Sequence, residues 1–209
     1  MTFSCSCPPK KVNTLPWVTS ANSSVIIPAI LHEDDQLGTI ALPGMEEDHG
    51  KFWQKTQKAL KYVWEHHRDE ADWFLKSDDD AFVFTGNLRA FLRHFDPEKP
   101  HYFGAPVNFF PDSDRNARVN AGGAGYVLSH EALRSFIEDS LPHPQKCYTG
   151  FRPDFKSDED TELGLCLQSV GIVPNRTHDS GGKCRFFMRN PLGPLAEVAG
   201  NYDQWALVK

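Results

Sequence analysis

Residues 72–84 read DWFLKSDDDAFVF, and this stretch decides how the rest of the sequence is interpreted. A short apolar run at residues 73–75 is typical of a buried strand, and it ends near three consecutive carboxylates, Asp78, Asp79 and Asp80. Adjacent negative charges repel one another, and burying one of them without a partner is costly. The pattern therefore predicts a positive group at the end of this strand.

Two interpretations of the three acids are open. One is a solvated turn between two strands. However, such turns usually contain Gly, Asn or Pro, whereas these acids stand between apolar runs at residues 73–75 and 81–84. The other is a metal site, because carboxylate oxygens are hard ligands suited to Mg²⁺ or Mn²⁺, and the bound cation can accept phosphate oxygens at its remaining positions. The apolar flanks favour metal-assisted phosphate binding.

Length and composition indicate one folded domain, and the alternation of strands and helices along the chain makes it an α/β domain. The chain has 209 residues, of which 40% are hydrophobic, and this is enough to form a substantial core. Its formal net charge of −6 argues against a nucleic-acid partner. No apolar run approaches the roughly 18–20 residues that cross a bilayer.

Cysteines and glycosylation motifs leave the compartment open. Cys147 and Cys166 bracket a polar loop and a helical segment, so a disulfide between them is one possibility. With five cysteines in all, one remains unpaired within the chain whichever pairs form. Asn22 and Asn175 begin N-x-Ser/Thr tripeptides, which also arise by chance.

Alternating strands and helices are predicted from residue 51 onward, after a segment rich in Pro, Ser and acidic residues. Ser129 and Ser157 are the expected N-caps of two helices, and Gly171 is the expected end of the second. We expect helices over residues 51–67, 86–95, 130–140 and 157–171, strands at residues 73–75, 102–104 and 126–128, and extended chain at residues 81–84.

Two further stretches carry candidate chemistry. Residues 121–126, AGGAGY, can bring the backbone close to a ligand, but they match neither a dinucleotide fingerprint nor a P-loop, and a tight packed crossing explains them equally well. Residues 157–164, SDEDTELG, place acids at the start of a helix. There they either complement the helix dipole or supply a general base.

Taken together, these stretches resemble the β-1,3-glycosyltransferase family, which includes fringe and the core 1 β-1,3-galactosyltransferases, with the core 1 enzymes the closer. The resemblance spans roughly residues 50–183. It rests on the segments FWQKTQKALKYVWEHH, DEADWFLKSDDDAFV, NLRAFLRHFDPEKPHYFG, AGGAGYVLSHEALRSF and DEDTELGLCL. It implies a GT-A-like fold, in which helices flank a central mixed sheet; a form that lacks the first strand–helix unit is one option.

The resemblance also implies the chemistry of the site. A DxD-type motif would bind Mn²⁺, or Mg²⁺, and the diphosphate of UDP-galactose, with Asp80 and Asp78 as metal ligands and Asp78 and Asp79 near the donor. Asp160 would be the catalytic base of an inverting transfer, and Glu159 is the second choice. The turn at Gly123, Ala124 and Gly125 would shape the donor and acceptor pocket, whereas Trp73 and Tyr126 would pack against substrate or core.

Two departures from the family pattern stand out. Phe187 occupies the position of a metal-binding His, and His178 is a nearby candidate to replace it. The anchor, the stem and the nucleotide-cradling unit of the family are not recognisable before residue 51. We therefore expect a truncated or divergent member, with a poorly defined segment at residues 1–48, the catalytic domain at 49–188 and a divergent tail at 189–209.

The implied function is transfer of galactose to the 3-hydroxyl of O-linked N-acetylgalactosamine on a glycoprotein or glycopeptide acceptor. The resemblance places such a protein in the secretory pathway as a type II Golgi membrane protein, with a homodimer as one option for its assembly. One alternative is a catalytically impaired relative that binds or chaperones a true transferase, although the intact acid triple counts against it. The other is a fringe-like transferase with a different sugar pair.

Overall fold

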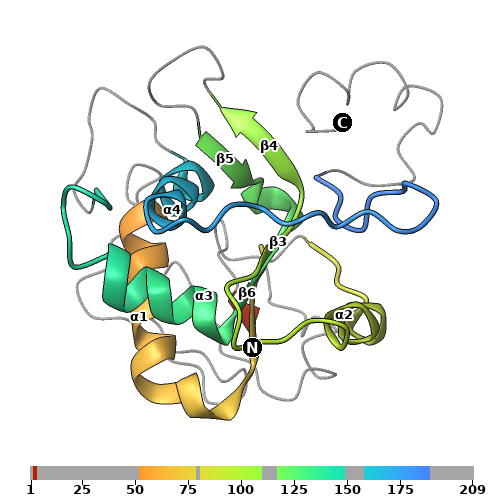
Figure 1. Ribbon diagram of the computed structural model, residues 1–209, viewed down its shortest axis with the longest axis horizontal. Helices are drawn as coiled ribbons and strands as arrows, with labels where there is room; N and C mark the ends of the chain where they lie inside the picture. Colours follow the sequence, from red (N-terminus) through yellow and green to blue (C-terminus); the bar gives the residue numbers. More distant parts are fainter. Residues whose placement is uncertain (1, 4–51, 79–80, 110–116, 149–157, 189–209) are drawn as a thin grey trace, which may run out of the picture.

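The computed structural model describes residues 2–3, 52–78, 81–109, 117–148 and 158–188 (Figure 1). The expected segments at residues 1–48 and 189–209 therefore lie almost entirely outside the described residues. The elements are β1 (Thr2–Phe3), α1 (Phe52–His67), η3 (Arg68–Glu70), β2 (Trp73–Lys76), α2 (Thr85–Leu92), β3 (Tyr102–Phe103), β4 (Pro106–Phe109), β5 (Ala117–Asn120), the 3₁₀ turn η4 (Gly122–Ala124), β6 (Tyr126–Ser129), α3 (His130–Arg134), the π-helical η5 (Ser135–Ser140) and α4 (Glu159–Gln168).

The first helix follows the predicted periodicity. Its buried residues are Trp53, Lys55, Thr56, Ala59, Leu60, Val63 and Trp64. Spacing of three and four residues puts these side chains on one face, so the apolar stripe turns toward the core. Lys55 is the exception, because the pattern places it on the polar side and the structure buries it.

The central sheet is mixed, as the family resemblance implies. Its strand order is β1-β2-β6-β3, in which β1 runs parallel to β2 and the other neighbours are antiparallel. In the β2–β6 ladder, Lys76 lies opposite Tyr126. The pairing of β1 was not expected, because residues 1–48 gave no clear strand at this position.

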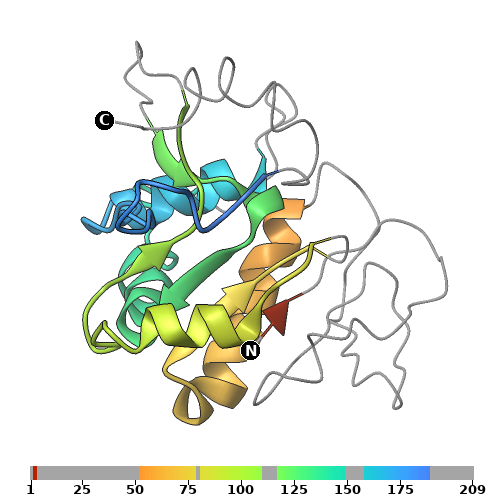
Figure 2. The same cartoon turned by 90° about the vertical axis from the view of Figure 1, so that its right-hand side faces the viewer.

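Helices cover both faces of this sheet (Figures 1 and 2). Successive strand residues point to opposite faces, so Phe74, Tyr126 and Leu128 share one core cluster, with residues of α1, α3 and α4. Leu75 and Val127 point the other way, into a second cluster with residues of α2. The α/β architecture is confirmed, and a fold of the GT-A type is consistent with it.

The last helix packs closely on a separate two-stranded ladder, β4–β5. Gly164 of α4 faces Val119 of β5, and a Cβ atom built on Gly164 would lie 2.7 Å from the Val119 Cβ. Real Cβ atoms essentially never come so close, so this crossing requires glycine.

Gly164→Ala is expected to destabilise the fold by about 1–3 kcal/mol, because a methyl group would force α4 away from β5. Thermal or urea unfolding measures the change. The matched control is Gly86→Ala in α2, where nothing lies within 4 Å of the added Cβ, so stability should rise slightly, since alanine favours helix. Equal stabilities of the two variants would contradict the close crossing.

A disulfide joins Cys147 to Cys166, which confirms the possibility drawn from the sequence. Both residues are buried, and Cys166 lies in α4, so the bond ties the chain after η5 to the last helix.

Replacing both cysteines with alanine is expected to cost about 2–4 kcal/mol, because the unfolded chain regains the entropy of an open loop. Urea unfolding with and without a reductant measures this cost. Cys184→Ala serves as the control, since that thiol is free and exposed. A reductant that leaves the wild-type transition unmoved would contradict a stabilising role.

Helix ends match the sequence in part. The Ser129 hydroxyl accepts from the Ala132 amide, so this N-cap is confirmed. The expected cap Ser157 lies outside the described residues; α4 instead begins after Asp158, which makes no side-chain capping bond. The helix ends at Gln168 rather than at the expected Gly171. Gly171 closes the turns that follow, with φ of 81° and an amide that donates to the Gln168 carbonyl.

Three expectations about elements need correction. The second helix ends at Leu92 rather than residue 95, although single turns follow it. The helix expected over residues 130–140 is α-helical only to Arg134 and then widens into π geometry. Residues 81–84 pair with no neighbouring strand among the described residues, and the Ala81 amide donates to the Asp78 carbonyl.

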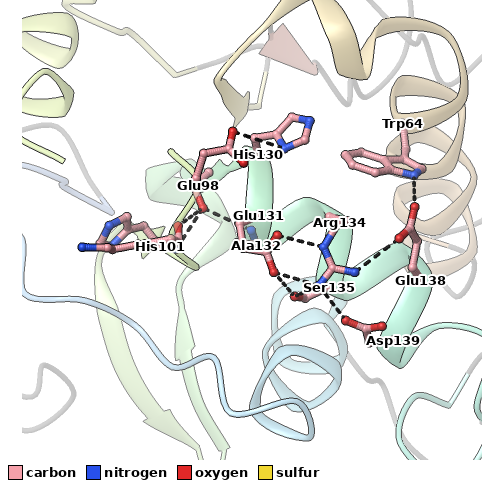
Figure 3. Close-up of polar contacts among 12 residues, drawn as sticks. Trp64, Glu98, His101, His130, Glu131, Ala132, Arg134, Ser135, Glu138 and Asp139 are labelled. Carbon is pink, nitrogen blue, oxygen red and sulfur yellow. Dashed lines mark hydrogen bonds and ion pairs between the residues drawn. The ribbon is translucent and has the colours of Figure 1, made fainter. Parts of the chain in front are cut away.

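Arg134 is the centre of a polar network that joins α1 to α3 and η5 (Figure 3). Its guanidinium donates to both carboxylate oxygens of Glu131 at 2.8 Å and reaches Glu138 and Asp139. The Trp64 indole donates to the same Glu138 carboxylate. Since these acids are partly exposed, water screens the pairs, and the network orients the helices more than it stabilises them.

The second glycosylation motif has an internal structural role. The Asn175 side-chain oxygen accepts from the Tyr102 amide at 2.8 Å, and the Asn175 amide donates back to the Tyr102 carbonyl. The buried Thr177 hydroxyl donates to the Gly104 carbonyl at 2.9 Å. The motif thus fastens the chain after α4 along β3.

Candidate functional site

Three segments that carry predicted site residues meet at one end of the sheet. They are the end of β2 with Asp78, the turn η4 with Gly123 and Ala124, and the start of α4 with Glu159 and Asp160. Hydrogen bonds and ion pairs connect all three. Residues far apart in sequence are therefore brought together where the sequence placed its candidate chemistry.

Lys76 is the positive group that the sequence demands at this strand end. Strand alternation turns it to the same face as Phe74, where its side chain is 8% exposed. Its ammonium lies 2.7 Å from Asp78 Oδ1 and 2.7 Å from Glu159 Oε1. Burial by itself lowers the pKa of Lys76, but Glu159 and Asp78 outweigh it, so the pKa lies above its ordinary value.

The Glu159 carboxylate is engaged on both oxygens. Oε1 pairs with Lys76, and Oε2 accepts from the Tyr126 hydroxyl at 3.1 Å. Tyr126 is fully buried, and burial followed by the nearby Glu159 charge raises the pKa of its hydroxyl. The phenol therefore stays neutral and donates, so Glu159 is held by neighbouring strands from two sides.

Asp160 is held by two backbone amides. Its Oδ2 accepts from the Gly122 amide and its Oδ1 from the Thr161 amide, both at 2.7 Å. Burial, and then the neighbouring Glu159, raise the pKa of Asp160 to about 6, while the two amides oppose the shift. The Thr161 hydroxyl also donates to Oδ1, at 3.5 Å, whereas the Gly122 amide is the one donor described at Oδ2. Oδ2 therefore keeps a lone pair with which the carboxylate can accept a proton near neutral pH.

Two positions of the glycine turn have no room for a side chain. A Cβ on Gly122 would lie 2.9 Å from Glu159 Oε1. Gly125 has φ of 69°, and a Cβ there would lie 3.0 Å from the Lys76 carbonyl oxygen. Gly123 differs from both: it is exposed and faces open space, whereas Ala124 is half-buried. The exposed part of the turn is thus at Gly123.

Of the three consecutive acids at residues 78–80, the structure describes only Asp78. The Asp78 side chain is 29% exposed and is paired with Lys76 through Oδ1, whereas Asp79 and Asp80 lie outside the described residues. Within the described ranges, no group of three His, Cys, Asp or Glu side chains is arranged to hold a metal ion. Carboxylate oxygens still fit Mn²⁺ or Mg²⁺ by ligand type.

The position expected for a metal-binding His carries an exposed Phe187, half of whose surface is accessible. The alternative His178 lies against Cys184, with Nε2 3.4 Å from the Sγ atom. Phe186 packs into the cluster that contains Val83, so this segment runs beside the chain after the acid triple. There Phe82 and Phe84 are exposed and pack edge to face.

Trp73 and Tyr126 both belong to the core. Tyr126 is inaccessible, and Trp73 is partly buried against the cluster under α2, near His101 and Phe103. Of the alternatives left open by the sequence, packing against the core describes both residues. Lys76 is the site residue that the sequence analysis did not single out, although the two-residue period of β2 was the signal that could have found it.

Comparison with known proteins gives a consistent result. A model of the Fringe-like family matches residues 29–179. A glycoprotein-N-acetylgalactosamine 3-beta-galactosyltransferase 1 from Xenopus laevis is 34% identical over 164 residues, which cover 78% of this chain and 42% of that protein.

More distant relatives carry other names. Chondroitin sulfate synthase 3 from Mus musculus is 29% identical over 143 residues, or 65% of this chain and 15% of that protein. N-acetyllactosaminide beta-1,3-N-acetylglucosaminyltransferase 4 from Homo sapiens is 31% identical over 144 residues, which cover 60% of this chain and 34% of that protein. The chain therefore spans less than half the length of each of these relatives.

Proposed function

The chain belongs to the Fringe-like family, and from this premise we propose that it is a metal-dependent, inverting β-1,3-glycosyltransferase. The proposed reaction moves galactose from UDP-galactose to the 3-hydroxyl of O-linked N-acetylgalactosamine on a glycoprotein. We take the donor sugar and the acceptor sugar from the name of the relative that is 34% identical.

The observation that carries the proposal is the position of Asp160. This carboxylate is partly buried and bound to the Gly122 amide, and it has a pKa of about 6, beside the pair formed by Lys76 and Asp78. A base with this pKa is ionised at neutral pH and can still accept a proton from a hydroxyl group. Its neighbour Glu159 is occupied by Lys76 and Tyr126, which favours Asp160 as the base.

The proposed mechanism is a single displacement. Asp160 removes the proton from the acceptor 3-hydroxyl as that oxygen attacks the anomeric carbon, and the bond to the UDP oxygen breaks on the opposite face. When bound, Mn²⁺ or Mg²⁺ supplies charge stabilisation to the departing diphosphate. Asp80 and Asp78 would hold the cation, Asp79 would lie near the donor, and Gly123 to Gly125 would border the sugar.

A different sugar pair is the second candidate. The relatives include enzymes named for chondroitin and for N-acetyllactosamine, so the same chemistry can serve other donors and acceptors in this family. A non-catalytic binding role is less favoured, because Asp160 and Asp78 are both present and the Asp160 carboxylate is placed in the cluster.

The proposed location is the secretory pathway, with the Golgi membrane as the expected site of action. The Cys147–Cys166 disulfide supports this location, since such bonds persist in oxidising compartments. Among the helices that the structure describes, none is long and apolar enough to span a membrane.

A donor and acceptor matrix tests the proposed function. The chain is incubated with Mn²⁺, with UDP-galactose, UDP-N-acetylglucosamine or UDP-glucuronate as donor, and with a GalNAc-peptide or another glycan as acceptor. Mass spectrometry of the product is expected to show one added hexose on the GalNAc-peptide, from UDP-galactose only and lost with EDTA. Transfer with another pair would support the second candidate. Transfer with no pair would reject both.

A further inference from the structure

Lys76 joins two parts of the site that have different tasks. Asp78 belongs to the strand end that is proposed to bind the metal and nucleotide, and Glu159 begins the helix that carries the proposed base. One ammonium group lies 2.7 Å from an oxygen of each. It is also 5.6 Å from the centre of the Tyr126 ring, which lies opposite it in the strand ladder.

We propose that Lys76 is a positioning residue that fixes the start of α4, and with it the Asp160 carboxylate, relative to the end of β2. The assignment of Asp160 as the positioned group rests on the proposed function. The mechanical part, a clamp between strand and helix, stands on the ion pairs alone.

The start of α4 depends on contacts from outside the helix. Asp158, the residue before its first turn, makes no side-chain capping bond. Glu159 is instead held by Lys76 of β2 and by Tyr126 of β6, through different oxygens. Consecutive helical residues are related by a fixed rotation, so holding Glu159 also sets the direction in which Asp160 leaves the helix toward Gly122.

The clamp needs a positive charge. Without it, Asp78 and Glu159 would lose the ammonium group that lies within 2.7 Å of both, and the two carboxylates would repel each other. The start of α4 would then shift away from β2. A metal ion bound to Asp78 would compete with Lys76, because both positive groups would share the same carboxylate.

Lys76 holds Glu159 and competes with a cation for Asp78, so its removal should lower the rate of transfer but should not weaken metal binding. In Lys76→Met, transfer should slow by roughly 10- to 100-fold in kcat, since a small misplacement of a catalytic group has that effect, while KM for the donor changes little. Mn²⁺ should bind at least as tightly as in wild type, as measured by the electron paramagnetic resonance signal of free Mn²⁺. Hydrogen exchange at the amides of Thr161 to Leu163 should become faster.

Three variants complete the experiment. Lys61→Met is the matched control, because Lys61 is exposed and, among the described residues, pairs with Glu65 on the surface of α1. It should change none of the readouts. Lys76→Arg retains the charge and should restore much of kcat. Glu159→Gln releases the clamp from the helix side, and combined with Lys76→Met it should lose no more activity than the worse single variant.

The proposal is overturned if Lys76→Met behaves like Lys61→Met, if the kcat and Mn²⁺ affinity of Lys76→Met fall together, or if the two losses in the double variant simply multiply. Should Lys76→Met not fold, Glu159→Gln alone decides: unchanged exchange in α4 rejects the clamp. If the wild-type chain transfers no sugar, the proposed function fails, but the exchange measurements still accept or reject the clamp.

Discussion

Asp160→Asn is expected to reduce transfer to the GalNAc-peptide by roughly 10²- to 10⁴-fold, the usual contribution of a general base. Binding of UDP-galactose with Mn²⁺ should remain, because Asn keeps the size of the side chain and one of its two acceptor oxygens. Asp160 also makes no contact with Asp78 among the described contacts. Initial rates at saturating donor measure the loss, and calorimetry measures the binding. Loss of both together would place Asp160 among the binding residues instead.

The matched control is Asp158→Asn, two residues earlier. Asp158 is exposed and makes no side-chain capping bond, so its loss removes one negative charge from the same helix end without removing the base. Transfer by this variant should stay close to wild type. Equal losses in the two variants would mean that the charge of the helix end matters and the position of Asp160 does not.

The raised pKa of Asp160 makes the same residue visible in pH profiles. Since the base must be ionised, kcat/KM should rise as pH increases through about 6 and then level off. Stability follows the opposite direction: a carboxyl with a raised folded-state pKa contributes stability below its unfolded value, and this contribution is lost as pH rises through 6. The stability of Asp160→Asn relative to wild type should therefore increase between pH 4 and 7.

Asp80→Ala is expected to abolish the metal-dependent part of nucleotide binding. If Asp80 is a direct ligand, its loss should weaken Mn²⁺-dependent UDP binding by at least about tenfold, since even residues that only support metal ligands have effects of this size. Binding measured by calorimetry with Mn²⁺ and with EDTA separates the metal-dependent part from the rest. UDP affinity that is unchanged in the presence of Mn²⁺ would contradict the assignment.

Asp69→Ala is a suitable control for this change. Asp69 is an acid in η3 whose side chain is 89% exposed and lies 3.8 Å from Arg68. Asp69→Ala removes one negative charge, as Asp80→Ala does, but at a position outside the acid triple in the sequence. A similar loss of UDP binding in this variant would indicate a general electrostatic effect.

Much of the fold could be predicted because its signals are local. The period of α1, the apolar run of β2 and the cap at Ser129 each depend on a few neighbouring residues, and all three are found. The features that were missed depend on distant partners. The parallel pairing of β1 with β2 and the crossing of Gly164 over Val119 join segments that no local pattern connects.

The site likewise contains residues that the sequence could predict and residues that it could not. The acids could be recognised because clustered carboxylates beside a buried strand need a partner, and the resemblance assigned them roles. The partner itself, Lys76, looked like an ordinary lysine before an acidic run, and only the arrangement of β2, β6 and α4 shows that it is buried between Asp78 and Glu159. The occupation of Glu159 likewise depends on Tyr126.

Thermal unfolding with Mn²⁺ alone, UDP-galactose alone and both together tests most directly whether the acidic strand end holds a cation that in turn holds a sugar nucleotide. The account predicts stabilisation only when both are present. At a free ligand concentration of about 100 times Kd, it should reach about 2.7 kcal/mol, or about 5–10 °C. An unchanged transition with both ligands, or the same shift without the metal, would contradict it.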